Sequence, residues 1–146
     1  MQMNMSHKIK SLQGWYDEVW TNGNLDAISS FLAPDARTRG IMGDMPFVAD
    51  DMAELVSMIR EQLGPITVTL PVTVEQDKWL SALIEVKSRS LATGDPIHIF
   101  GQVIVRFENE KMSEVYKGVD SLMLFEQLGM LPENAMAIML SGTRLQ

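Results

Sequence analysis

The sequence predicts an α+β fold in which N-terminal helices pack on a strongly curved antiparallel sheet and enclose an apolar pocket. Apolar residues with helical spacing occupy most of the first 60 or so residues, and a period of two replaces this spacing at about residue 66. Short helical segments return after residue 120. Helices followed by a run of strands are typical of α+β domains, in which the helices cover one face of the sheet.

Two helices are expected at the start of the chain. Apolar residues with the spacing of one helix face run through residues 6–21, and Asn22-Gly23 then supplies a left-handed stop. Asn24 begins a shorter second helix. This helix must end before Pro34, because a proline disfavours helical backbone in the residue that precedes it.

A short strand, a loop and a third helix follow. Residues 36–41 alternate weakly between apolar and polar types and predict a strand, whereas residues 42–50 have the composition of a loop. The third helix begins at Asp50 or Asp51 and closes at Gly64-Pro65. Its inward face carries Met52, Leu55, Val56 and Ile59.

Four segments with a period of two predict an antiparallel meander, over residues 66–75, 78–91, 96–108 and 111–120. Pro71 lies inside the first of these segments, which indicates an edge strand or a bulge because proline cannot donate to a neighbouring strand. Two short apolar helical segments follow the meander. They are separated at Gly129, and Pro132 is expected as the first residue of the second.

Length, charge and composition limit the possible functions. A chain of 146 residues predicts one domain over 1–146, with an ordered core at about 6–142. The absence of cysteine and the presence of only two histidines argue against a metal site. A net charge of −7 argues against nucleic-acid binding. The chain has neither an apolar run long enough for a membrane span nor the apolar core of a signal peptide, so we expect a cytoplasmic protein.

Two segments resemble a known family. The opening WYDEVWTNGNLDAISSFLAPDA at 15–36 and the segment KMSEVYKGVDSLMLFEQLGML at 111–131 are similar to the SnoaL-like polyketide cyclases of the nuclear transport factor two-like fold. The resemblance implies a cone-shaped domain that forms a homodimer and uses no cofactor. It also implies ring closure by intramolecular aldol condensation, with the aspartate before the L-x-x-Q-L-G helix as general acid and base.

Asp120 is the residue that matches this aspartate, and Tyr116 is the second candidate catalytic residue. One face of a strand with a period of two carries Met112, Glu114, Tyr116, Gly118 and Asp120, so a phenol would lie beside the carboxylate if that face lines the pocket. A structural role is equally open for Asp120. It directly precedes a helical segment, and backbone N–H groups at a helix N-cap lower the pKa of the capping carboxylate.

Eight residues are expected to line the pocket: Trp15, Tyr16, Met42, Met52, Ile59, Arg89, His98 and Gln102. Core packing remains open for Trp15 and Tyr16, as does a plain strand position for His98. Arg89 shares a strand face with Trp79, and this face is solvated, a dimer surface or a pocket wall. Segment 88–96 lacks the histidine that family cyclases often carry in a G-T-H sequence.

Two classes of function follow. In the first, the domain is a cofactor-independent enzyme that performs aldol-type cyclisation, or a related proton transfer, on a small apolar carbonyl compound. In the second, the same pocket binds a hydrophobic ligand without catalysis, or the domain serves as a dimeric interaction module. In both we expect a homodimer through the sheet, because Val103, Val105 and Phe107 form an apolar stripe on one of its faces.

Overall fold

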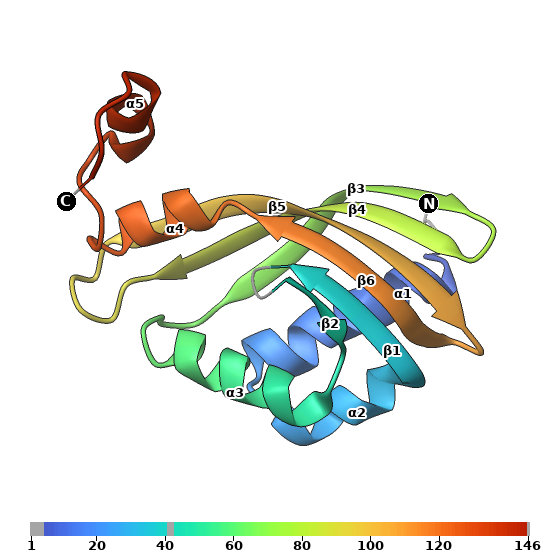
Figure 1. The fold of residues 1–146 in the computed structure, drawn as a ribbon. Coiled ribbons are helices and arrows are strands. Elements are labelled where there is room, and N and C mark those ends of the chain that lie inside the picture. Colours follow the sequence, from blue (N-terminus) through green and yellow to red (C-terminus); the bar gives the residue numbers. More distant parts are fainter. Residues whose placement is uncertain (1–4, 41–42, 146) are drawn as a thin grey trace, which may run out of the picture.

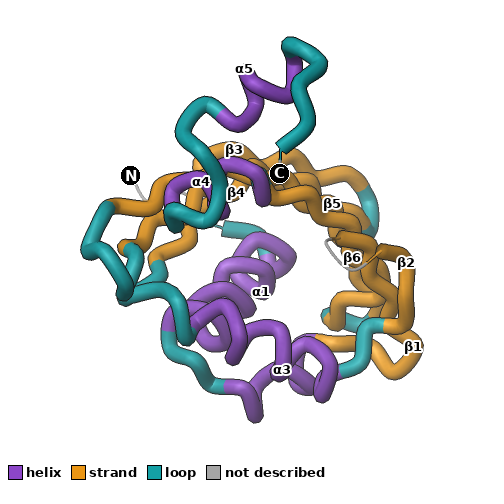
Figure 2. The backbone as a smooth tube through the Cα atoms, turned by 60° about the vertical axis from the view of Figure 1, so that its left-hand side comes forward, coloured by secondary structure: helices purple, strands orange, loops and turns teal. Residues whose placement is uncertain are grey.

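The computed structural model describes residues 5–40 and 43–145, and the side chains of residues 40–45 are outside that description. The chain forms an α+β domain in which a curved sheet wraps around N-terminal helices (Figures 1 and 2). This arrangement confirms the predicted fold class. The helical part before the meander consists of α1 (His7–Trp15), the π-helix η1 (Tyr16–Thr21), the 3-10 turn η2 (Leu25–Ala27), α2 (Ile28–Phe31) and α3 (Ala49–Arg60).

The strands are β1 (Leu32–Gly40), β2 (Gly43–Pro46), β3 (Thr67–Gln76), β4 (Trp79–Arg89), β5 (Pro96–Glu108) and β6 (Lys111–Val119). They form one sheet in the order β2-β1-β6-β5-β4-β3. The four long strands are the predicted antiparallel meander, and β1 adds to it in parallel with β6. Pro71 lies on the edge strand β3, where the register with β4 shifts between Thr69 and Val72, so both expectations for this proline are met.

Each long strand separates an inner face from an outer face. On β5 the burial alternates strictly from Pro96 to Phe107, so that Val103, Val105 and Phe107 belong to the core. The structure therefore corrects the expectation that these three residues form a dimer surface: they pack against the helices of their own domain. The outer face instead exposes Val72, Val74, Trp79, Phe100, Ile104 and Tyr116.

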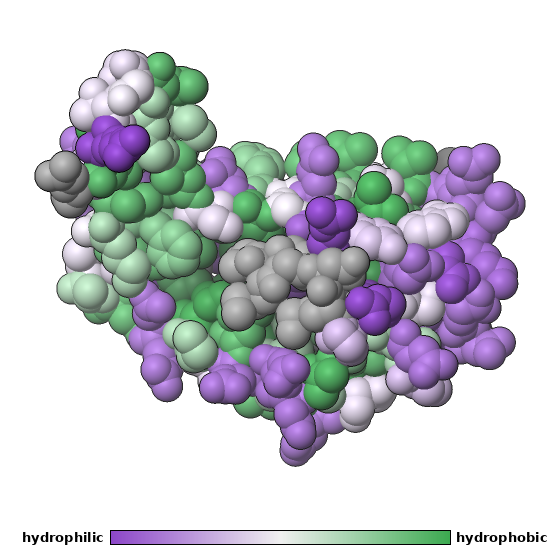
Figure 3. All heavy atoms as spheres, viewed as in Figure 1, coloured by the Kyte–Doolittle hydropathy of each residue, from purple (hydrophilic) through white to green (hydrophobic). Residues whose placement is uncertain are grey.

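Two local expectations differ from the structure. Part of the expected loop at 42–50 pairs with β1 as the short strand β2. The last helix, α5 (Ala135–Leu140), begins after Asn134 rather than at Pro132. It is preceded by α4 (Ser121–Gln127). In Figure 1, α5 projects from the body of the domain, and Figure 3 shows apolar atoms on the surface of this arm. Leu140 at its end is exposed. No helix in residues 5–40 and 43–145 is long and apolar enough to cross a membrane.

Candidate functional site

A cavity of about 500 Å³ lies between the inner face of the sheet and the helices η1 and α3. Its walls come from β3, β4, β5 and β6 on one side and from α3 on the other, and Leu124 of α4 contributes at one end. Most of the lining is aliphatic or aromatic, including Val68, Ile84 and Ile99. Its size and composition are those of a site for a small organic ligand.

Few polar groups reach this cavity. Lys117 projects into it from β6, Thr38 from β1 and Tyr16 from η1, and the exposed acidic residues Asp51 and Glu54 border it on α3. The Thr38 hydroxyl is buried without a hydrogen-bond partner among the described residues. Burial raises the pKa of the Tyr16 phenol far above its usual range, so this side chain is a neutral hydrogen-bond donor at any ordinary pH.

Lys117 is the only basic residue in the described lining. It lies on the same side of β6 as Val115 and Val119, which are buried and half-buried. Its Nζ lies 5.7 Å from the centroid of the Phe47 ring, a cation–π distance, and no carboxylate in the described part of the chain forms a salt bridge with it. Burial lowers the pKa of the Lys117 amine to about 8.

Three of the predicted pocket residues line the cavity, namely Tyr16, Met52 and Ile59. Trp15 does not. It is buried behind the lining, in edge-to-face contact with Phe31 and Phe47 at centroid distances of 5.8 and 5.6 Å. Core packing is thus the role of Trp15 in this fold. Met42 lies outside the described residues.

The predicted catalytic pair does not enter the cavity. Asp120 is exposed and is the N-cap of α4, and its Oδ1 accepts a hydrogen bond of 3.0 Å from the Met123 backbone N–H. Tyr116 lies on the outer face of β6, where its hydroxyl donates to Glu114 at 2.6 Å and its ring stacks on Trp79. The common face of Glu114 and Tyr116 is as expected, but this face points away from the cavity.

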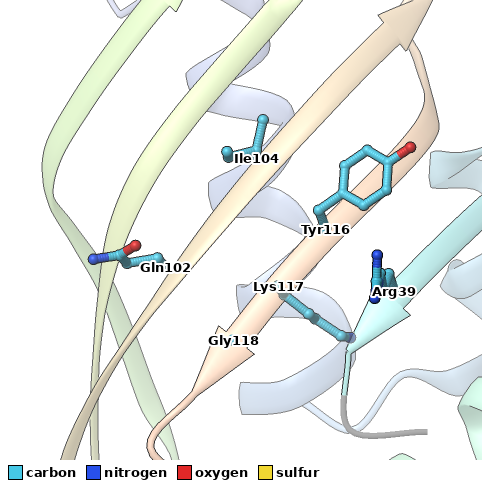
Figure 4. A pocket seen from close by; sticks show the side chains of 6 residues that line it. All are labelled: Arg39, Gln102, Ile104, Tyr116, Lys117 and Gly118. Carbon is cyan, nitrogen blue, oxygen red and sulfur yellow. The ribbon is translucent and has the colours of Figure 1, made fainter. Parts of the chain in front are cut away.

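The remaining predicted pocket residues also lie on the outer side of the sheet. His98 Nε2 is 2.6 Å from the Glu85 carboxylate. The His98 backbone N–H donates a hydrogen bond to the Gln127 side-chain oxygen, and the His98 carbonyl accepts one from the Gln127 side-chain nitrogen. Arg89 is exposed near the end of β4, so its strand face belongs to the outer side of the sheet and not to the cavity wall, which leaves the solvated and the dimer-surface interpretations open. Gln102 borders a shallow depression, which is also lined by Arg39, Ile104, Tyr116, Lys117 and Gly118 (Figure 4).

A model of the SnoaL-like domain matches residues 12–115 of the chain. The chain belongs to the SnoaL-like domain family. The match ends at Val115, so Lys117 and Asp120 both lie beyond it. No curated protein matches the sequence.

Solved structures share the fold of this SnoaL-like domain. A proposed polyketide cyclase from Acidithiobacillus ferrooxidans has a TM-score of 0.74 at 16% identity, over 88% of this chain and 98% of that one. IdmH, a proposed polyketide cyclase from Streptomyces antibioticus, has a TM-score of 0.71 at 17% identity, over 85% and 99%. A protein of ketosteroid isomerase-like fold from Catenulispora acidiphila, solved with trimethylamine, has a TM-score of 0.71 at 14% identity, over 86% and 95%. At these identities the likeness establishes the fold.

Sequence reasoning missed Lys117 as a cavity residue of the SnoaL-like domain. The face of β6 was assigned from Asp120, which stands after the strand has ended. The register between β5 and β6 also shifts between Arg106 and Phe107, and Met112 and Ser113 are both buried. Met112 therefore does not share the outer face of Glu114. The alternation of Val115, Lys117 and Val119 was the available signal, because apolar residues identify the inner face of a half-buried strand.

Proposed function

We propose that this SnoaL-like domain binds a small, mostly apolar carbonyl compound in the central cavity and catalyses proton transfer on it, as in an aldol-type cyclisation. The observation that carries the proposal is the cavity itself, which combines a predominantly apolar wall with a few inward polar groups, among them Tyr16, Thr38 and Lys117. A substrate in such a cavity is surrounded by little water, so each hydrogen bond to its carbonyl oxygen becomes stronger.

The polar groups suit an enolisation of the substrate. The Tyr16 phenol is buried and protonated, and can donate a hydrogen bond to the oxygen on which negative charge develops. The Lys117 amine has a pKa in the range in which a side chain both accepts and returns a proton near neutral pH. These groups belong to the protein, so the proposed reaction needs no cofactor.

The test is hydrogen–deuterium exchange at the carbon next to the carbonyl of 2-acetonaphthone, followed by NMR in deuterated buffer. We expect the wild-type protein to accelerate this exchange. Val86→Trp should abolish the acceleration, because Val86 lines the cavity and an indole at this position would fill it. Lys87→Trp is the matched control, since the next residue of β4 is exposed on the outer face. Equal exchange in both variants would contradict a reaction in this cavity.

Binding without catalysis is the second candidate function. It is favoured by the position of Asp120, whose carboxylate caps α4 and does not reach the cavity. In this case 2-acetonaphthone should quench the fluorescence of Trp20, which borders the cavity, without any exchange of its α-hydrogens.

We also propose that a second copy of the chain covers the outer face of the sheet. The exposed apolar side chains of Val72, Val74, Phe100 and Ile104 lie on this face, and exposed apolar patches on a folded domain are commonly sites of association. Ile104→Glu should convert a dimer into a monomer in sedimentation analysis. Leu91→Glu, in the turn after β4, is the control that should leave the dimer intact. A wild-type protein that is monomeric at micromolar concentration would refute this assembly.

A further inference from the structure

The Lys117 side chain differs from the other lysines of the chain that have described partners. Lys8 and Lys78 form salt bridges with Glu75 and Glu108, and Lys111 donates to the backbone oxygen of Ser30. Lys117 contacts only the face of the Phe47 ring among the interactions of the described residues. Burying a positive charge without a counter-charge costs free energy, and a cation–π contact offsets only part of that cost.

Lys117 lines the ligand cavity, and it also borders the outer depression. In Figure 4 the Lys117 side chain runs from β6 toward the end of β1, away from the outward Tyr116 ring. Thr38 reaches the same cavity from β1, and it pairs with Val115, two residues before Lys117 on the same face of β6. The buried Thr38 hydroxyl has no hydrogen-bond partner within the described part of the chain, and its place in the sheet lets it share a ligand with the amine.

We infer that the central cavity takes a small organic anion, a carboxylate or the enolate of an acidic carbonyl compound, with its charged oxygen on the Lys117 ammonium and its apolar body between α3 and the sheet. The ligand oxygen supplies the counter-charge that Lys117 lacks among the described side chains. The Thr38 hydroxyl donates a second hydrogen bond to it, and the aliphatic lining packs against the rest of the ligand.

The acidic residues of the cavity fix the orientation of this anion. Asp51 and Glu54 lie on α3 with exposed side chains, across the cavity from the sheet, and repel a negative group placed near them. The charged end of the ligand therefore points to β6. The protein as a whole carries a net charge of −7, which opposes non-specific binding of anions, so anion binding must depend on a local positive group.

An anionic ligand in this cavity requires that the cavity is a binding site, as in the proposed function. It does not require that the protein turns the ligand over. The first probes are 2-naphthoate and the neutral 2-acetonaphthone, which have the same ring system and differ in charge. Isothermal titration calorimetry at pH 7 should give tighter binding of the naphthoate. A 1,3-diketone with a naphthyl group, titrated alongside, distinguishes a carboxylate site from an enolate site.

Lys117→Met should weaken 2-naphthoate binding by about tenfold or more, which is the usual value of a hydrogen bond to a charged group, and should leave 2-acetonaphthone binding unchanged or tighter. Lys87→Met is the matched control. It removes the same charge from the same sheet but from the exposed outer face, and should not alter either affinity. Thr38→Val should weaken naphthoate binding by a smaller factor, and it serves as a second variant if Lys117→Met does not fold.

The dependence of 2-naphthoate affinity on pH distinguishes a lysine that binds the anion from a lysine with a purely structural role. Among the described residues, the titratable groups that line the cavity with Lys117 are Tyr16 on η1 and Asp51 and Glu54 on α3, and the charged Arg39 of β1 borders the outer depression together with it. Naphthoate affinity should fall as pH rises through about 8, where the amine loses its proton, and this fall should be absent in Lys117→Met. Equal loss of naphthoate in both lysine variants, or no loss in either, overturns the inference. If neither probe binds the wild-type protein, the proposed ligand site itself fails.

Discussion

The buried amine of Lys117 should make the stability of the ligand-free protein depend on pH above neutrality. An unfolded lysine holds its proton up to a pKa of 10.5, whereas the folded amine releases it at about 8. Between these values the unfolded chain binds more protons than the folded one, so the free energy of unfolding rises with pH across this window and levels off above it. Below pH 8 the penalty for burying the charge is present in full.

The size of the effect follows from the shift. The two pKa values imply roughly 3 kcal/mol, because one pKa unit corresponds to about 1.36 kcal/mol. Solvent that enters the cavity reduces this figure, and we expect a gain of about 1–3 kcal/mol. For a chain of this length the entropy of unfolding is about 0.3 kcal/mol per degree, so the melting temperature changes by roughly 3–10 °C.

The assay is thermal or urea unfolding of the wild-type protein and Lys117→Met between pH 7 and 10.5. We expect Lys117→Met to be the more stable protein at pH 7, with a difference that shrinks as the pH rises. Lys87→Met should track the wild type at every pH, which removes any general effect of net charge. A Lys117→Met protein that is less stable at pH 7, or a difference that is constant with pH, would show that the amine is solvated and that the reasoning is wrong.

Three further predictions concern single positions. Asp120→Ala should lower the free energy of unfolding by about 1 kcal/mol, because the α4 cap is lost, whereas Asp120→Asn should change it little. An Asn variant with normal stability but with turnover reduced about a hundredfold would instead support a catalytic role for Asp120. Gly101→Ala should destabilise the sheet by about 1–3 kcal/mol in urea unfolding, because a Cβ there would lie 2.9 Å from the Gly118 carbonyl oxygen; a melting temperature equal to that of wild type would refute the close approach. Arg60→Met should lower the free energy of unfolding by about 1 kcal/mol, because the Arg60 guanidinium donates hydrogen bonds to the last two backbone carbonyls of η1. An unchanged melting temperature would mean that water satisfies these carbonyls in the variant.

Much of the fold could be predicted because its signals are local. The change from helical spacing to a period of two located all four long strands to within one or two residues. The first helical segment begins after the Ser6 cap and ends at Gly23, which has a φ of 69°. The sequence does not predict that the second half of this segment is a π-helix. The short strand β2 was missed, because four residues with a proline carry too little periodicity.

The site was harder to predict because it depends on which face of each strand points inward. A one-residue change of phase moves every side chain of a strand to the opposite face. Tyr16, Met52 and Ile59 were placed correctly because helix spacing fixes their direction, and β6 was placed incorrectly because an aspartate beyond its end was used as the reference. The apolar stripe on β5 was recognised, but whether it meets helices or a second copy is a question of tertiary packing.

Near the end of β6, residues a few positions apart have different roles. Asp120 is the last residue before α4, and its carboxylate accepts a hydrogen bond from the Met123 N–H, so it is the N-cap of this helix and does not line the cavity. Gln127 then fastens α4 to the backbone of β5. Three residues before the cap, Lys117 points into a cavity that offers it no carboxylate partner among the described residues. The resemblance to the family implies a role for the Asp120 carboxylate, whereas the position of the Lys117 amine in the cavity is the basis on which we propose it as the group that binds the ligand.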